Sequence, residues 1–174
     1  MKELFNPRVI DFETKIIAKQ ITDHHRDDKS PIVFICLLNG GFMFFSDLVK
    51  NCNFDFECDF MRVKSYIGKK KQGDIEITKD LEVSIKGKTV YIIDDIFDSG
   101  NTMKAVVEYL RLKHPSNINL VTLAKRKKNK WIPKQPEEVD TFRYGFELDD
   151  EWVIGYGMDN DNGHCRNYKT IYEI

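Results

Sequence analysis

The sequence has no excess of basic residues, because 27 lysines and arginines are balanced by 28 aspartates and glutamates, giving a net charge of -1. Proteins that bind nucleic acids usually carry a clear basic excess. We therefore expect no nucleic-acid partner. Any polyanion that this protein binds should be small and held by a local site.

Cysteines are few and unpaired in the sequence. The four of them, Cys36, Cys52, Cys58 and Cys165, form no C-x-x-C motif. Since Cys36 and Cys58 lie in strand-like apolar runs, we expect buried, reduced thiols rather than zinc ligands or disulfides. The first residues do not resemble a signal peptide, and no apolar stretch approaches the length that spans a membrane. These absences predict a cytoplasmic protein with no membrane partner.

Repeats, linkers and low-complexity tracts are also missing, so we expect a single domain over residues 1–174. Hydrophobic residues make up 41% and charged residues 32%, a globular composition rather than a disordered one. A chain of this length can bury a core large enough to fold alone.

What is present is an alternation of strand-like and helix-like segments. Apolar residues at helical spacing predict helices at 11–24, capped by Asp11, at 42–49 and from Met103 to His114. Apolar runs predict strands at 32–38, 56–64, 89–93 and 118–124, with short strands near 143–146 and 152–158. The polar stretch 65–80 is expected to be a long loop. This order favours an α/β fold: a mostly parallel central sheet flanked by helices, with a small C-terminal hood.

The segment 90–102 carries the clearest chemical signal. It reads as an apolar strand, an acidic pair, a turn and the start of a helix. In open parallel sheets, ligands bind beyond the carboxyl ends of the strands. The N–H groups at the start of a helix favour a phosphate, and glycine lets the backbone approach it closely. We expect a phosphate on the turn, at Ser99, Gly100, Asn101 and Thr102.

The acidic pair upstream of this turn needs a different ligand. Asp94 and Asp95 would repel an anion, whereas two adjacent carboxylates can accept hydrogen bonds from a sugar diol or hold hydrated Mg²⁺. A ribose 5-phosphate satisfies both halves of the segment. The residues alone therefore predict a site for a 5′-phosphorylated ribose.

This thirteen-residue pattern resembles the ribose-phosphate signature of the type I phosphoribosyltransferases. Further similarity, from about Leu37 to Tyr168, is to the hypoxanthine-guanine phosphoribosyltransferase family. The residues 38–44 resemble the pyrophosphate loop of that family, and the run Val153–Asp159 resembles its element for 6-oxopurines. The resemblance implies the type I phosphoribosyltransferase fold.

The resemblance also implies roles for individual residues. Asp98 would be the general acid or base that handles the N7 proton of the purine, and we expect partial burial beside other carboxylates to make it suitable. Lys125 would contact the 6-oxo group, although a lysine in a basic patch after a strand is ordinarily solvated. Trp152 would stack on the base, with Val153 nearby, although a single tryptophan is more often part of a core. Asp159 would bind the purine and, as the second acidic site of the family, would bind Mg²⁺ on the pyrophosphate side.

Other implied residues handle pyrophosphate and close the site. Asn39, Gly40 and Arg166 would contact pyrophosphate, although many relatives carry lysine where Asn39 stands. Asp94 and Asp95 would hold Mg²⁺ together with Asp159. Ser65 and Tyr66 would form the tip of a lid that keeps water from a cationic, oxocarbenium-like sugar.

The implied reaction transfers the phosphoribosyl group of 5-phosphoribosyl 1-pyrophosphate to hypoxanthine or guanine, a step of purine salvage that yields IMP or GMP. Relatives are dimers or tetramers, so we expect a homo-oligomer. A receiver domain is excluded because its acidic pair follows the first strand. Two alternatives stay open: a catalytically idle sensor of the sugar pyrophosphate, which would most simply lack Asp98 or the lid residues, and a same-fold enzyme for another base.

Overall fold

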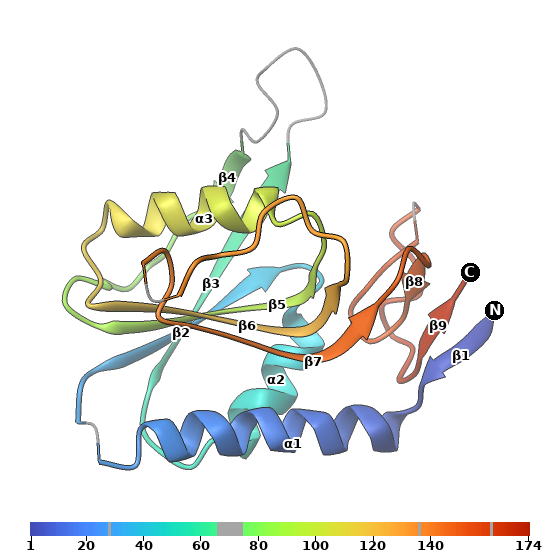
Figure 1. Cartoon of the computed structure of the whole chain (residues 1–174), viewed down its shortest axis with the longest axis horizontal. Coiled ribbons are helices and arrows are strands. Elements are labelled where there is room, and N and C mark those ends of the chain that lie inside the picture. The colour runs from blue at the N-terminus through green and yellow to red at the C-terminus, as the bar shows by residue number, and fades with distance from the viewer. Residues whose placement is uncertain (28, 66–74, 136, 161) are drawn as a thin grey trace.

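The computed structural model describes residues 1–27, 29–65, 75–135, 137–160 and 162–174. It has two β-sheets and three helices in these segments (Figure 1). In chain order the elements are β1 (Lys2–Phe5), α1 (Pro7–His24), β2 (Ile32–Leu38), α2 (Phe42–Asn51), β3 (Glu57–Ser65), β4 (Ile75–Lys79), β5 (Thr89–Phe97), α3 (Asn101–Arg111), β6 (Asn117–Arg126), β7 (Thr141–Leu148), β8 (Val153–Ile154) and β9 (Ile171–Glu173).

The larger sheet has six strands in the order β4-β3-β2-β5-β6-β7. All neighbours pair in parallel except β3 and β4, which are antiparallel. The central strand β2 is buried at every position but Leu38, which explains its seven consecutive apolar residues. Because β2, β5 and β6 are parallel, their carboxyl ends meet at one edge of the sheet. The predicted α/β class with a mostly parallel sheet is confirmed.

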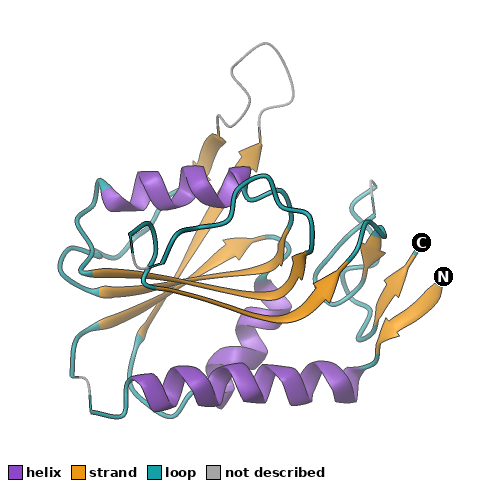
Figure 2. Ribbon diagram, viewed as in Figure 1, coloured by secondary structure: helices purple, strands orange, loops and turns teal. Residues whose placement is uncertain are grey.

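Helices cover both faces of this sheet (Figure 2). On one face, α1 and α2 pack through apolar residues such as Ile17, Ile21 and Phe44 onto one hydrophobic cluster. On the other face, α3 buries Met103, Val106, Val107 and Leu110 in a second cluster. Helices on both faces bury the sheet and leave its carboxyl edge available for a ligand.

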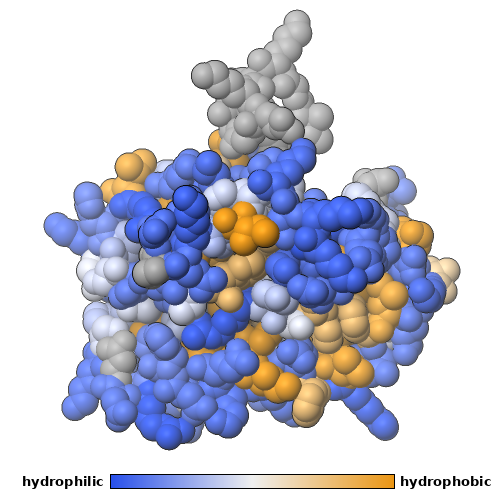
Figure 3. Space-filling view, viewed as in Figure 1, coloured by the Kyte–Doolittle hydropathy of each residue, from blue (hydrophilic) through white to orange (hydrophobic). Residues whose placement is uncertain are grey.

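The smaller sheet is an antiparallel hood in the order β1-β9-β8, and it includes both ends of the chain (Figure 1). Phe5 stacks on Phe146 at a ring distance of 3.9 Å and so joins the hood to the end of β7. Figure 3 shows a mostly hydrophilic face, on which apolar side chains gather between α1 and the hood. The hood was expected from the C-terminal segment alone. The participation of β1 was not predicted.

Several predicted boundaries were wrong. The cap of α1 is Asn6, not Asp11, because the Asn6 side chain accepts hydrogen bonds from the N–H groups of Arg8 and Val9 at 3.0 and 3.1 Å. The helix predicted to run to His114 ends at Arg111. Near 152–158, only Val153–Ile154 forms a strand.

One strand, β4, was not predicted, and another, β5, is longer than predicted. The expected loop 65–80 contains β4, where Ile75 and Ile77 pack against the cluster beneath α3. The strand predicted to end at Ile93 continues to Phe97, because β6 pairs with it that far. The acidic pair therefore lies in the last part of β5 rather than after it.

The four cysteines are free thiols, but only one matches the expected burial. Cys36 is fully buried in β2, whereas Cys58 is exposed on β3. Burial raises the pKa of Cys52 to about 12. Within the described segments, no helix combines the length and the apolar character needed to cross a membrane.

Candidate active site

The acidic pair lies at the carboxyl end of β5, between β2 and β6. Asp94 pairs in register with Thr122 of β6, and the N–H of Asp95 donates to the Asp94 carboxylate at 3.0 Å. Burial, reinforced by the adjacent Asp95, raises the pKa of Asp94 well above its ordinary value. Burial also raises the pKa of Asp95, against the opposing effect of its hydrogen bond with Asp94. Two carboxylates held this close favour a ligand that brings positive charge or hydroxyl donors.

The turn after β5 is the place where a phosphate site was predicted. Gly100 has a φ of +82° at the start of α3, a conformation that favours glycine. A cavity of about 250 Å³ lies here, lined by Asp94, Ile96, Phe97, Asp98, Ser99, Gly100, Thr102 and Met103. Asn101 is not among the lining residues; its N–H is held by the Ser99 hydroxyl at 3.3 Å. The first turn of α3 therefore meets a cavity that fits an anion.

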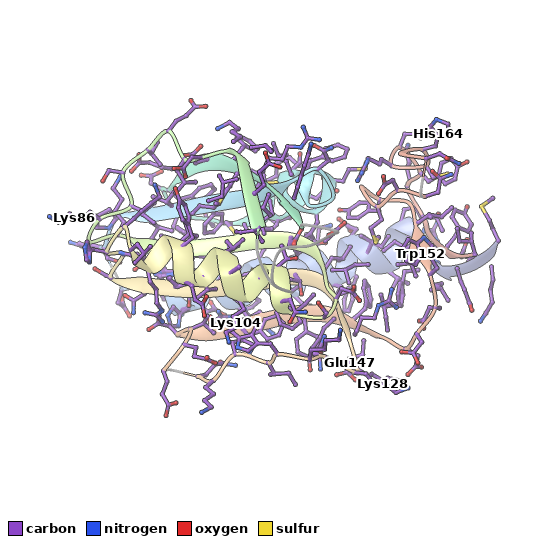
Figure 4. The ribbon with its side chains drawn as sticks, turned by 90° about the horizontal axis from the view of Figure 1, so that it is seen from above. Lys86, Lys104, Lys128, Glu147, Trp152 and His164 are labelled. Atoms are coloured by element: carbon purple, nitrogen blue, oxygen red, sulfur yellow. The ribbon has the colours of Figure 1, made fainter. Side chains whose placement is uncertain are left out.

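A second cavity, of about 230 Å³, adjoins the first. It is lined by Asp95, Ile96, Asp98, Arg126, Trp152, Val153, Met158 and Asp159. Asp98 and Ile96 line both cavities. Trp152 is 54% exposed, so it is not a core residue and its ring is available for stacking. Figure 4 shows Trp152 at the opposite end of the molecule from Lys86, which lies near the start of β5.

Asp98 itself does not have the expected surroundings. Its side chain is 73% exposed, and its partner is a cation: the Arg126 guanidinium donates to it at 2.9 Å through Nε. The predicted partial burial beside other carboxylates was wrong, because the turn carries Asp98 outward from Asp94 and Asp95. Asp98 lines both cavities, and its role as general acid or base stays a prediction.

Lys125 lies in β6 rather than after it, and neither cavity is lined by it. Its ammonium pairs with Glu147 at 2.8 Å and lies 4.6 Å from the centre of the Tyr144 ring. The contact of Lys125 with a purine stays a prediction. The neighbouring cations Lys127 and Lys128 pair with Asp149 and Asp150, so the basic patch is neutralised by the next loop.

The loop of Gly40 and the segment of Arg166, both predicted to contact pyrophosphate, meet at Gly157. A Cβ on Gly40 would lie 1.9 Å from the Asp95 carboxylate, and one on Gly157 would lie 2.1 Å from the Gly40 carbonyl oxygen. Arg166 pairs with Asp159 at 2.7 Å and donates to the Gly157 carbonyl at 2.6 Å. The loop after β2 thus contacts both the acidic pair and the segment between β8 and β9, which only glycines permit. Asn39 is exposed at the same loop.

The carboxylates suit a metal that arrives with its substrate. In the described segments, no three His, Cys, Asp or Glu side chains cluster closely enough to hold a metal alone. Mg²⁺ keeps several waters and is usually held by one or two carboxylates plus substrate phosphates. Asp94 lines the cavity at the start of α3, and Asp95 and Asp159 line the adjoining cavity, so all three carboxylates face the candidate site. These residues fit a divalent cation.

Of the two predicted lid residues, the structure describes only Ser65. Ser65 is the last residue of β3, where its backbone pairs with Ile75 of β4. Tyr66 lies outside the described residues. The lid role of both residues stays a prediction.

Sequence reasoning missed two residues of this site, Arg126 and Asn129. Asn129 donates through Nδ2 to the carbonyl oxygens of Phe97, at 3.2 Å, and of Asp98. Successive side chains of a strand point to opposite faces, so the pair Lys125-Arg126 necessarily presents only one of its cations to the cavity. That alternation was the available signal for Arg126. No local pattern marked Asn129.

Comparison with known proteins agrees with this geometry. The family model of the phosphoribosyl transferase domain matches residues 7–161. The hypoxanthine phosphoribosyltransferase of Salmonella typhimurium is 39% identical over 144 residues, covering 82% of this chain and 78% of that protein. The hypoxanthine-guanine phosphoribosyltransferase of Aquifex aeolicus is 34% identical over 175 residues, covering 100% of this chain and 94% of that protein.

A solved structure shows the same arrangement of elements. The hypoxanthine phosphoribosyltransferase of Trypanosoma cruzi, in complex with the product IMP, superposes with a TM-score of 0.88 at 28% sequence identity. The match covers 99% of this chain and 94% of that one.

Proposed function

This chain belongs to the phosphoribosyl transferase family, and from that membership we propose the reaction that its site carries out. The protein is a purine salvage enzyme that transfers the 5-phosphoribosyl group of 5-phosphoribosyl 1-pyrophosphate to hypoxanthine or guanine. The products are IMP or GMP and pyrophosphate. The transfer is a pentosyl transfer, so the enzyme is a glycosyltransferase.

The observation that carries this proposal is the position of Asp98, which lines both cavities. One cavity, with Ser99, Gly100 and Thr102 at the start of α3, suits the 5-phosphate. The other, with Trp152, suits the base. A ribose that joins the two would place the new glycosidic bond beside Asp98.

The chemistry then assigns a task to each group. As N9 of the base attacks C1 of the ribose, pyrophosphate leaves and the sugar passes through a cationic, oxocarbenium-like state. Asp98 takes the proton released from N7 of the base. Asp94 and Asp95 accept hydrogen bonds from the ribose hydroxyls. Asn39, Gly40 and Arg166 contact the departing pyrophosphate.

A divalent metal, which we propose to be Mg²⁺, would be held by Asp94 and Asp95 on the ribose side and by Asp159 on the pyrophosphate side. When bound, it neutralises the charge that builds on the leaving pyrophosphate. The chain's own contribution is to present these carboxylates at adjoining cavities.

Base recognition combines stacking with polar contacts. Trp152 stacks on the purine, Lys125 contacts its 6-oxo group, and the backbone near Val153 and Asp159 contacts its 2-position. To reach the purine, Lys125 would have to leave Glu147, its partner at 2.8 Å. Because stacking tolerates different bases, selectivity for 6-oxopurines rests on the polar contacts.

We also propose that residues 1–174 act as one domain, in a cytoplasmic enzyme that forms a homo-oligomer. The lid residues Ser65 and Tyr66 would exclude water during the transfer.

The experiment that tests the function is an ultraviolet assay with 5-phosphoribosyl 1-pyrophosphate and Mg²⁺. Hypoxanthine, guanine, xanthine and adenine are offered separately to the wild type and to Asp98→Asn. We expect turnover of 6-oxopurines and a loss of about 10²–10⁴-fold in kcat for the variant. Tight binding of the sugar pyrophosphate with no turnover of any base would instead support a sensor.

A further inference from the structure

The Arg126 side chain links three of the segments around the site. From the end of β6, its Nε donates to the Asp98 carboxylate at 2.9 Å. Its Nη1 donates to the carbonyl oxygens of Asp149 and Glu151 at 2.9 and 2.7 Å. The turn that carries Asp98 and the segment that leads into Trp152 are therefore joined through one guanidinium.

The guanidinium is well suited to fix an exposed carboxylate. The Arg126 side chain is only 15% exposed, whereas that of Asp98 is 73% exposed. A guanidinium is planar, always charged and carries several donors in fixed directions, so one end can be anchored while the other orients its partner. Here the two carbonyl oxygens anchor the group and leave Nε directed at Asp98.

The backbone of Asp98 is held independently of its carboxylate. Asn129 donates to the Asp98 carbonyl oxygen, and the N–H groups of Lys130 and Trp131 donate to the carbonyl of Ser99 at 3.0 and 3.1 Å. The turn would thus keep its place without Arg126. What Arg126 adds is the direction of the carboxylate.

The loop after β7 also has other attachments. Lys127 pairs with Asp149 and Lys128 pairs with Asp150, both at 2.9 Å. These exposed ion pairs remain when Arg126 is changed, so the loop keeps part of its support and stacking on Trp152 need not be abolished. A change at Arg126 should act mainly on Asp98.

We propose that Arg126 is a positioning residue for the transfer reaction, orienting the Asp98 carboxylate toward N7 of the bound purine. The proposal rests on the proposed function, in which Asp98 takes the N7 proton. Misdirecting a proton acceptor by about 1 Å can lower a rate about 100-fold. Arg126 needs no contact with the base to have this effect.

The test is a double-mutant cycle on kcat, with 5-phosphoribosyl 1-pyrophosphate and hypoxanthine at saturation. The four proteins are the wild type, Arg126→Gln, Asp98→Asn and the double variant. We expect Arg126→Gln to lose about 10- to 100-fold in kcat. In the Asp98→Asn background the same change should cost less than about threefold, because there is no carboxylate left to orient.

Two further variants separate this role from a loss of folding. Arg126→Lys keeps a positive charge near Asp98 but lacks the planar guanidinium with its fixed donors. Its kcat should therefore lie between those of Arg126→Gln and the wild type. Lys128→Gln removes an exposed cation of the same loop, which pairs with Asp150 and not with Asp98, and should keep wild-type kcat and KM. Circular dichroism and a thermal melt on each variant check the fold.

Each outcome decides between the claims. Multiplicative losses in the cycle, or a rise in the KM for hypoxanthine with unchanged kcat, would overturn the positioning role and leave the proposed function intact. A wild type without turnover would overturn both. The role of Arg126 is supported if the kcat losses in the cycle are non-additive and Lys128→Gln has the kcat and KM of the wild type.

Discussion

Gly40→Ala tests whether the loop after β2, the proposed pyrophosphate loop, works in direct contact with the acidic pair. A Cβ at position 40 would lie 1.9 Å from Oδ2 and 2.5 Å from Cγ of Asp95, whereas real Cβ contacts essentially never fall below 3.0 Å. One of the two groups must therefore move by at least about 1.1 Å. The Asp95 carboxylate is also held by the N–H of Ile96 at 2.7 Å, so it cannot turn away without losing that bond.

The expected cost follows from overpacking. Adding a methyl group to a filled space costs about 1–3 kcal/mol. If the free variant relieves the clash by moving Asp95, and substrate binding must move Asp95 back, the whole cost is paid on binding. The value of kcat/KM for 5-phosphoribosyl 1-pyrophosphate then drops by roughly 5- to 150-fold, since 1.4 kcal/mol corresponds to a factor of 10. Initial rates at varied sugar pyrophosphate, with hypoxanthine at saturation, measure this loss.

Gly87→Ala is the matched control. Gly87 has a φ of +71°, and a Cβ there would meet nothing within 4 Å. It precedes β5, whose other end carries the acidic pair. The left-handed conformation should cost about 1–2 kcal/mol in the free energy of unfolding and leave the kinetics unchanged. Unchanged kcat/KM in a folded Gly40→Ala, or an equal kinetic loss in Gly87→Ala, would refute the reasoning.

Three other predictions concern the base cavity, the hood and the thiols. Trp152→Ala should raise the KM for hypoxanthine by roughly 5- to 150-fold, from a stacking loss of about 1–3 kcal/mol, with little effect on the melting temperature because the ring is largely exposed; Trp152→Phe should recover most of it. Tyr156→Phe removes a hydrogen bond of 2.6 Å to Asp47 and should lower the free energy of unfolding in urea by about 1 kcal/mol at pH 7. Burial would raise the pKa of Asp47, but hydrogen bonds from a nearby lysine and Tyr156 outweigh it and lower the pKa, so this stabilisation is present above the unfolded pKa near 3.8 and should vanish as pH falls through the lower folded value. A thiol reagent followed by mass spectrometry should modify the exposed Cys58 in the native protein and reach Cys36 only in urea, because burial raises the pKa of Cys36 and excludes the reagent; equal rates would contradict the burial.

The sequence predicted the centre of the fold well because burial on both faces leaves a strong local signal. The prediction for β2 matches Ile32–Leu38 at both ends. Gly100 and the acidic pair were found because their chemistry is concentrated in one short segment. By contrast, β1 and β9 are short, and they pair although they lie at opposite ends of the sequence. No local pattern therefore distinguished them.

The errors at the site have a similar cause. The surroundings of Asp98 depend on Arg126, which lies 28 residues away in the chain. The partner of Lys125 is set by the register of β6 on β7, where it faces Glu147. Residue type and spacing can suggest that a lysine faces a ligand, but strand register decides which of two adjacent cations does so.

The pairing of β1 with β9 has a consequence for how the protein is made. Lys2 and Glu173 form an ion pair at 3.0 Å across a separation of 171 residues. The six-stranded sheet is complete in sequence once β7 has left the ribosome, whereas the hood must wait for β9. Since β8 joins the hood through β9 alone, the segment that carries Asp159 and Arg166 gains its support last. During synthesis, the turn after β5 should therefore form before the segment that carries Asp159 and Arg166, so a nascent chain would present the proposed phosphate site before the proposed pyrophosphate site.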